Sequence, residues 1–208
     1  MRPDRQIEPY DRNQILCWDW SGINLRKESQ GLEKAADSVQ RKVIDYLLQS
    51  DEPWDLIFDD DDAREAADVV AIRMTGDRLI VHLFHCKFSH EAQPGHRIAD
   101  MYEVCGQAQK SVYWRDKIGI DRLIPHLVER ERRRTNAGKS TRIEKGDYRI
   151  INEIGQRYSV LIPEFKVFVV QPGLSKHEAT REMLELLAAT SLYLNETFEI
   201  GFGVIASD

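Results

Sequence analysis

The sequence predicts an α/β fold in which one central mixed β-sheet is flanked by helices. Apolar residues recur at helical spacing over residues 32–49, which is typical of a helix with one buried face. Residues 66–74 and 78–88 are β-prone segments joined by a short polar link that contains Gly76, as in a β-hairpin. The second segment is apolar on both faces, so we expect it in the middle of a covered sheet.

The other elements follow from the same patterns and from capping and turn residues. Helices are predicted at residues 32–49, 98–114, 120–131 and 175–195. Strands are predicted at residues 54–58, 66–74, 78–88, 164–171 and 198–205. Ser175 and Glu178 have the spacing of a capping box, which favours a helix start there.

Length and composition indicate one domain. The chain has 208 residues, which suffices for one good core and not for a second full domain. We therefore expect an N-terminal arm at residues 1–30 and a single α/β domain at 31–208. Within that domain, residues 164–206 form a predicted strand–helix–strand unit.

Charge, cysteine content and hydropathy exclude several classes of protein. No apolar run approaches the ~20 residues that span a bilayer, and no signal peptide is present, so we expect no membrane contact. Three cysteines at irregular spacing predict reduced thiols and a cytoplasmic protein. The net charge of −6 is unlike that of a generic nucleic-acid binder, although the acidic block 59–62 supplies four of the negative charges.

The predicted hairpin gathers charged side chains at its open end. Antiparallel pairing about Gly76 places Asp68 opposite His85 or its neighbour, and Lys87 opposite Glu65 or its neighbour. Side chains alternate along a strand, so His85 and Lys87 share one face. Two carboxylates, an imidazole and an ammonium in one place indicate a functional site.

This arrangement resembles the PD-(D/E)xK nuclease superfamily, also called restriction-endonuclease-like. Asp68 matches the first acid of the motif and Lys87 its lysine. His85 stands where the family has Glu or Asp, giving a variant His-x-Lys, and Ala67 stands where the motif has Pro. The resemblance covers residues 32–114, in the order helix, strand, Asp strand, His-x-Lys strand, helix.

The last helix of this core adds a second point of resemblance. In the RecB-like branch of the family that helix carries Gln-x-x-x-Tyr, and Gln109 and Tyr113 have the same spacing here. The resemblance implies a restriction-endonuclease-like α/β fold and hydrolysis of phosphodiester bonds in nucleic acid.

The resemblance also implies a bound Mg²⁺ or Mn²⁺. Asp68 would ligate it together with Glu65 or with an acid of the preceding helix, for which Glu33 and Asp37 are candidates. The backbone carbonyl of Cys86 would contribute as the middle residue of the motif does in the family.

Lys87 and His85 would activate the attacking water, and Gln109 would orient the substrate or Lys87. For His85 several interpretations stay open. Imidazole is a poorer ligand than carboxylate for Mg²⁺ and suits Mn²⁺ better. It can also serve as a general base, or its presence can mean that cleavage has been lost.

Residues 130–142 are strongly basic, and we predict a mobile loop there. Beside a nuclease site such a loop could follow the phosphates of DNA, although a solvated loop is the more common outcome. The residues expected to contact nucleic acid are Arg132, Arg133, Arg134, Lys139 and Arg142.

Two structural interpretations compete with the catalytic one. Asp68 and Lys87 can form a plain salt bridge across the hairpin. Alternatively, a zinc site can form among His82, His85, Cys86, His90, His96 and Cys105. Strand alternation argues against zinc, because Cys86 points to the face opposite His85.

The sequence thus predicts a metal-dependent nuclease that acts on nucleic acid, with DNA favoured over RNA. The alternative is a catalytically inactive nucleic-acid-binding domain that works with a helicase or another DNA-processing partner. A third hypothesis is a zinc-stabilised interaction module.

Overall fold

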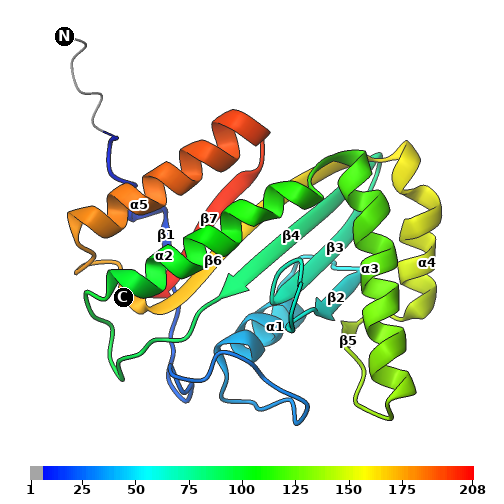
Figure 1. The fold of residues 1–208 in the computed structure, drawn as a ribbon, viewed down its shortest axis with the longest axis horizontal. Helices are drawn as coiled ribbons and strands as arrows, with labels where there is room; N and C mark the ends of the chain where they lie inside the picture. Colours follow the sequence, from blue (N-terminus) through cyan, green and yellow to red (C-terminus); the bar gives the residue numbers. More distant parts are fainter. Residues whose placement is uncertain (1–6) are drawn as a thin grey trace.

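A computed structural model describes residues 7–208, apart from the side chain at position 117, and contains a seven-stranded sheet (Figure 1). The first six residues of the predicted arm lie outside the described residues. The strands are β1 (Ile15–Cys17), β2 (Leu56–Asp59), β3 (Val69–Thr75), β4 (Arg78–Cys86), β5 (Ile143–Lys145), β6 (Ile162–Ser175) and β7 (Gly201–Ser207). The helices are α1 (Val39–Gln49), α2 (Ile98–Lys110), α3 (Asp116–Asn136), α4 (Tyr148–Arg157) and α5 (Arg181–Leu192).

The sheet is mixed. Its strand order is β1-β7-β6-β4-β3-β2-β5. Strands β5, β2, β3 and β4 pair antiparallel, whereas β4, β6, β7 and β1 pair parallel. Helices lie on both faces (Figure 1), which confirms the predicted α/β class with a central mixed sheet flanked by helices.

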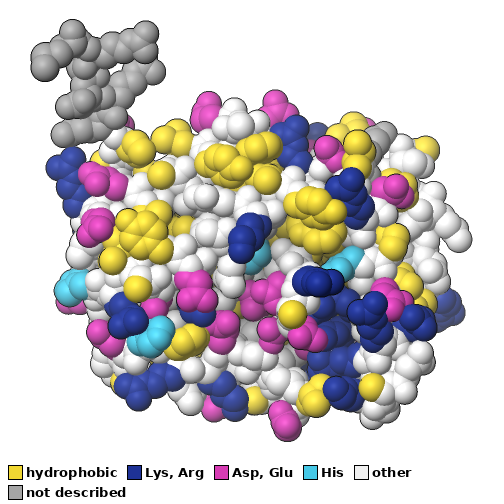
Figure 2. All heavy atoms as spheres, in the orientation of Figure 1, with side chains coloured by type: hydrophobic (Ala, Val, Ile, Leu, Met, Phe, Trp, Pro, Cys, Tyr) yellow, Lys and Arg dark blue, Asp and Glu magenta, His cyan; other side chains and the backbone are white. Residues whose placement is uncertain are grey.

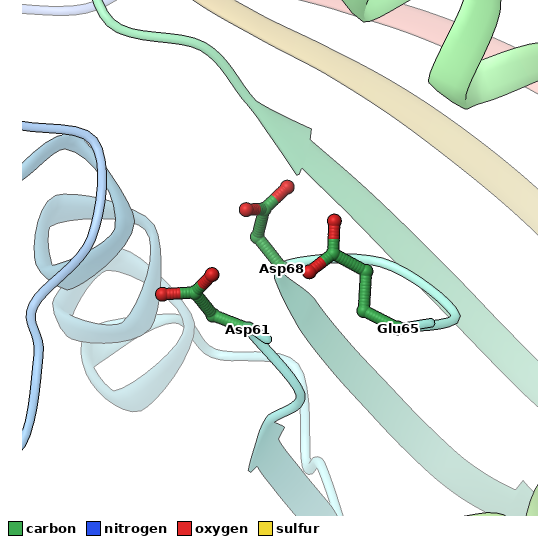
Figure 3. Close-up of side chains that lie close together, drawn as sticks. All are labelled: Asp61, Glu65 and Asp68. Carbon is green, nitrogen blue, oxygen red and sulfur yellow. The ribbon is translucent and has the colours of Figure 1, made fainter. Parts of the chain in front are cut away.

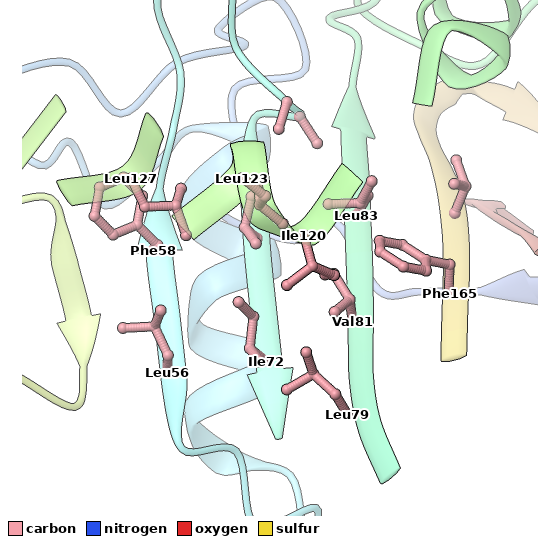
Figure 4. Packing of buried hydrophobic residues seen from close by; sticks show 14 of the residues in the cluster. Leu56, Phe58, Ile72, Leu79, Val81, Leu83, Ile120, Leu123, Leu127 and Phe165 are labelled. Carbon is pink, nitrogen blue, oxygen red and sulfur yellow. The ribbon is translucent and has the colours of Figure 1, made fainter. Parts of the chain in front are cut away.

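The central strand β4 separates two cores, as its sequence predicts. Leu79, Val81 and Leu83 lie in the larger core, which α2, α3 and α4 cover; Figure 4 shows them beneath side chains of α3. Phe84 and Cys86 lie in the core beneath α1 on the opposite face. A third cluster joins α2 and α5 to β7. Burial on both faces accounts for the continuous apolar run in this strand.

Helix α1 is shorter than predicted and begins at Val39 rather than at residue 32. Ser38 caps it, with its hydroxyl accepting a hydrogen bond from Arg41 N–H at 3.0 Å. The preceding residues form turns in which Gly31 and Lys34 have positive φ, a conformation incompatible with a helix.

The prediction of a mobile basic loop over residues 130–142 is wrong for its first half. Helix α3 continues to Asn136, so this stretch is helical. Arg132 and Arg133 pair with Glu129 one turn earlier, an arrangement that stabilises a helix. The chain leaves the helix at Ala137 and turns at Gly138, which has positive φ.

The C-terminal part also departs from prediction in detail. The Ser175 hydroxyl accepts a hydrogen bond from Glu178 N–H at 3.1 Å, but α5 begins only at Arg181 and Thr180 caps it. Strand β6 runs on to Ser175, with an irregular register against β7 after Gln171. Strand β5 and helix α4 were not predicted. Among residues 7–208, no helix is long and apolar enough to span a bilayer.

Candidate metal centre and the adjoining basic pocket

The predicted hairpin register is confirmed. Val69 pairs with Phe84 and Thr75 with Arg78, so Asp68 lies just beyond the paired end of β3. There the Asp68 carboxylate accepts a hydrogen bond from Cys86 N–H at 2.8 Å. This bond fixes the carboxylate at the point where β4 ends.

Three carboxylates meet at this end of the hairpin. Oxygen atoms of Asp61, Glu65 and Asp68 all lie within 4.8 Å of one another, and Figure 3 shows the side chains together where the loop after β2 leads into β3. The structure thus brings Glu65 and Asp68 together, as the metal-site hypothesis requires. It adds Asp61, which the sequence did not single out because it is one of four consecutive aspartates at positions 59–62.

The loop that carries Asp61 and Glu65 is held by Asp60. The buried Asp60 carboxylate accepts a hydrogen bond from Ala66 N–H at 2.7 Å and pairs with His126 and Arg130 of α3. Arg130 also donates to the backbone oxygen of Ala63. These contacts tie the loop to α3, so the carboxylates of the cluster are positioned before any ligand binds.

Electrostatics within the cluster favour a cation. Burial and the charge of Glu65 raise the pKa of Asp68 well above its usual value, against the opposing hydrogen bond from Cys86. Burial and the neighbouring aspartates, including Asp61, likewise raise the pKa of Glu65. Three oxygen ligands that repel one another are a donor set suited to a hard divalent ion such as Mg²⁺ or Mn²⁺.

Lys87 directly follows Cys86, whose N–H binds Asp68, but its side chain pairs with acids outside the cluster. Its Nζ is 2.7 Å from Glu103 Oε1 on α2 and 3.3 Å from Glu28 Oε2. Within the described residues it forms no ion pair with Asp68, so the predicted plain salt bridge between these two is absent. Burial alone would lower the pKa of Lys87, but the hydrogen bond to Glu103 and the charge of Glu28 outweigh it and raise the pKa.

Glu28 was not identified from the sequence. Its carboxylate accepts a hydrogen bond from Phe88 N–H at 3.0 Å, and its charge contributes to the raised pKa of Asp68. The acids suggested earlier do not take this place: Glu33 lies in the turns before α1, and Asp37 pairs with Lys27 at 2.8 Å. The arm before α1, rather than the helix itself, supplies the additional carboxylate.

His85 and Gln109 face partners other than the acidic cluster. His85 is 3% exposed, and its Nε2 lies 2.7 Å from Ser111 Oγ, in the turn after α2. Burial lowers the pKa of His85 to about 3, so the ring is neutral. Gln109 donates to Thr190 Oγ1 of α5 at 3.1 Å. Among the described residues, no hydrogen bond joins either side chain to Lys87.

The residues of the zinc hypothesis are dispersed. Cys86 is buried beneath α1, and Cys105 lies in the separate cluster between α2 and α5. His82 packs among aromatic rings, with its ring centroid 4.8 Å from that of Trp54. In residues 7–208 the group that could hold a metal is the carboxylate cluster.

Four of the five predicted nucleic-acid-binding residues line a pocket that shares Asp61 with the cluster, whereas Arg132 is exposed on α3 and pairs with Glu129. Figure 2 shows Lys and Arg side chains gathered over the C-terminal half of α3, beside Asp and Glu side chains in the middle of the view. Arg133, Arg134, Lys139 and Arg142 line one pocket. Arg142 is buried rather than presented on a loop, because its guanidinium donates to the backbone oxygens of Asp59 and Asp61, both at 3.0 Å.

Comparison of this chain with protein-family models, with curated proteins and with solved structures found no match.

Proposed function

We propose that this protein is a metal-dependent nuclease that hydrolyses phosphodiester bonds in DNA. The observation that carries the proposal is the group Asp61, Glu65 and Asp68 at the end of the β3–β4 hairpin, with Lys87 next in the chain after Cys86, whose N–H binds Asp68. The order α1-β2-β3-β4-α2 is the order of elements in the PD-(D/E)xK resemblance, which supports a place in that superfamily.

Each group has a role in this proposal. The three carboxylates would hold Mg²⁺ or Mn²⁺, which supplies positive charge against the phosphate when bound. Lys87, held by Glu28 and Glu103, would donate hydrogen bonds to a phosphate oxygen or to the attacking water. The water oxygen bonds to phosphorus and the bond from phosphorus to the sugar oxygen breaks. Water loses one proton in this step, and the leaving sugar oxygen gains one.

The test is hydrolysis of linear single-stranded DNA, linear duplex DNA and plasmid with Mg²⁺ or Mn²⁺. Asp68→Asn keeps an acceptor for Cys86 N–H and removes one charge from the cluster. We expect Asp68→Asn and Lys87→Met each to reduce the single-turnover rate by at least ~10²-fold, the usual scale for a positioned electrostatic group. Glu153→Gln, at an exposed position on α4, is the matched control.

Thermal melts decide whether a lost rate is catalytic or structural. Asp68 is buried beside two half-buried carboxylates, and removing its charge relieves repulsion, so Asp68→Asn should melt no lower than the wild type. Absence of metal-dependent hydrolysis in the wild type, or equal rates in wild type and Asp68→Asn, would refute the nuclease proposal.

A second candidate is a catalytically inactive nucleic-acid-binding domain that works with a helicase or another DNA-processing partner. One observation favours it: at the position where the superfamily has an acid, His85 is buried and bonded to Ser111. DNA binding by the purified protein without hydrolysis of any substrate in either metal would select this candidate.

The proposed place of action is the cytoplasm. Cys17, Cys86 and Cys105 are all free thiols. Thiols that remain unpaired suit a reducing compartment.

A further inference from the structure

A pocket of about 620 Å³ adjoins the acidic cluster, between α3 and the loop after β2. Asp61 belongs to both, because it lines the pocket and is one of the three clustered carboxylates. Five basic side chains line the pocket against three carboxylates, so the lining carries an excess of positive charge. The basic residues are Arg130, Arg133, Arg134, Lys139 and Arg142.

Three of the four guanidiniums are recessed, whereas that of Arg133 lies on the surface. The side chains of Arg130, Arg134 and Arg142 are 12%, 9% and 6% exposed. Burial and the charges of Arg130 and Arg134 lower the pKa of Arg142, against the opposing charge of Asp59. Cations buried so close together repel one another, and a bound anion relieves that repulsion.

Two arginines of the pocket lining each have one guanidinium nitrogen without a hydrogen-bond partner among the described residues. In the described part of the chain, Arg142 Nε and Arg134 Nη2 have no hydrogen-bond partner. The Arg134 nitrogen lies 3.7 Å from Asp59 Oδ2, beyond hydrogen-bond distance. Both nitrogens are enclosed by protein, and Arg134 Nε already donates to Ser140 O at 2.9 Å. They therefore add positive charge next to the pocket, and that charge favours an anionic ligand.

We propose that this pocket binds the terminal phosphate of a DNA strand, and that hydrolysis therefore proceeds from strand ends. A terminal monoester has three free oxygens and close to two negative charges, which match several guanidiniums at once. An internal phosphodiester has fewer free oxygens and one charge, and its two continuing chain directions keep it from entering a recess. Surface lysines and arginines suffice for such internal phosphates.

The second part of this inference, hydrolysis from strand ends, rests on the proposed nuclease function. Because Asp61 is shared, a strand whose end lies in the pocket presents its nearest phosphodiester bonds to the carboxylate cluster. The expected products are short, and circular single strands are expected to resist hydrolysis.

The experiment measures binding of one short single-stranded DNA sequence in three forms, with EDTA present so that hydrolysis does not interfere. The forms carry a 5′-phosphate, a 3′-phosphate or two hydroxyl ends, which distinguishes the two possible ends. We expect one phosphorylated form to bind at least about tenfold tighter than the hydroxyl form, as charge-assisted hydrogen bonds to a desolvated phosphate require.

The variants separate the pocket from the fold. Arg142→Gln removes donors to two backbone oxygens and can unfold the loop, so Arg134→Gln and the exposed Lys139→Gln are used instead. Arg134 also donates to Ser140 O, so a thermal melt of Arg134→Gln checks that the fold is retained. Arg134→Gln should abolish the preference for the phosphorylated end, and Lys139→Gln should weaken it. Arg181→Gln, on the distant α5 and outside the pocket lining, should retain it fully.

Equal affinity for all three strands, or a preference that survives in Arg134→Gln, would overturn the inference. Hydrolysis of circular single strands as fast as linear ones would overturn its consequence and leave the nuclease proposal standing. A preference that depends on Arg134, found without any hydrolysis, would support the pocket and refute the nuclease proposal instead.

Discussion

The burial of His85 makes the stability of the fold depend on pH. Its pKa in the folded protein is about 3, against about 6.5 in an unfolded chain. Below pH 6.5 the unfolded chain therefore binds a proton that the folded protein excludes. This contribution to stability is complete above pH 6.5 and is lost progressively as the pH falls towards 3.

We predict that His85→Gln reduces the acid sensitivity of the fold, because Gln does not titrate and can still bond to Ser111. Between pH 7 and pH 4 the wild type should lose about 3 kcal/mol more unfolding free energy than the variant. Urea unfolding at both pH values measures the difference, in which the other titrating groups cancel. Parallel losses in the two proteins would show that His85 is protonated in the folded state.

At the scale of elements, helix α3 replaces a predicted loop and changes what its arginines can do. Arg132 and Arg133 are exposed and pair only with Glu129 among the described residues, so they remain available to a phosphate backbone. Arg134 and Arg142 are turned inward to Asp59. A helix thus divides one basic stretch into a surface pair and a recessed pair.

We predict that replacing both Arg132 and Arg133 by Gln lowers the log–log salt slope of DNA binding by up to about two, because each arginine releases about one counterion. Gln is a good helix former, so α3 should remain intact. Binding isotherms from low to moderate salt measure the slope. Arg149→Gln with Arg157→Gln on α4 is the matched pair, and a slope lowered equally by both pairs would show that α3 has no special part in binding.

At the scale of the whole molecule, 35 acidic residues exceed 29 basic ones, and the net charge is −6. An acidic protein can bind DNA if its positive charge is concentrated and a bound cation offsets its carboxylates. The basic pocket and the acidic cluster lie side by side and share Asp61. This adjacency, rather than the average charge, would determine where DNA contacts the protein.

We predict that Mn²⁺ stabilises the wild-type fold. An ion that binds only the folded state adds about 2.7 kcal/mol at a hundred times its Kd, which raises Tm by roughly 5–10 °C. Asp61→Asn should reduce this shift strongly, whereas Glu153→Gln should not. Thermal melts at constant ionic strength make the comparison, and equal shifts in all three proteins would show that Mn²⁺ acts elsewhere.

The sequence by itself determined the features that depend on local periodicity. The alternation in β4 predicted its burial on both faces, and the link at Gly76 predicted the register that brings Asp68 to the end of β4. Both follow from the period of two along a strand and from short-range turn geometry. The same pairing predicted Glu65 near Asp68, but Glu65 reaches that place from the loop before β3 rather than from a strand.

Only the tertiary structure decided which distant side chains meet. Glu28 and Glu103 reach Lys87 from the arm and from α2, and His85 turns to Ser111 rather than to the carboxylates. These contacts depend on how separate elements pack against the sheet, and packing leaves no periodic signal in any one segment. The basic stretch became helical and partly buried for the same reason, since its partners Asp59 and Asp60 lie far away in the chain.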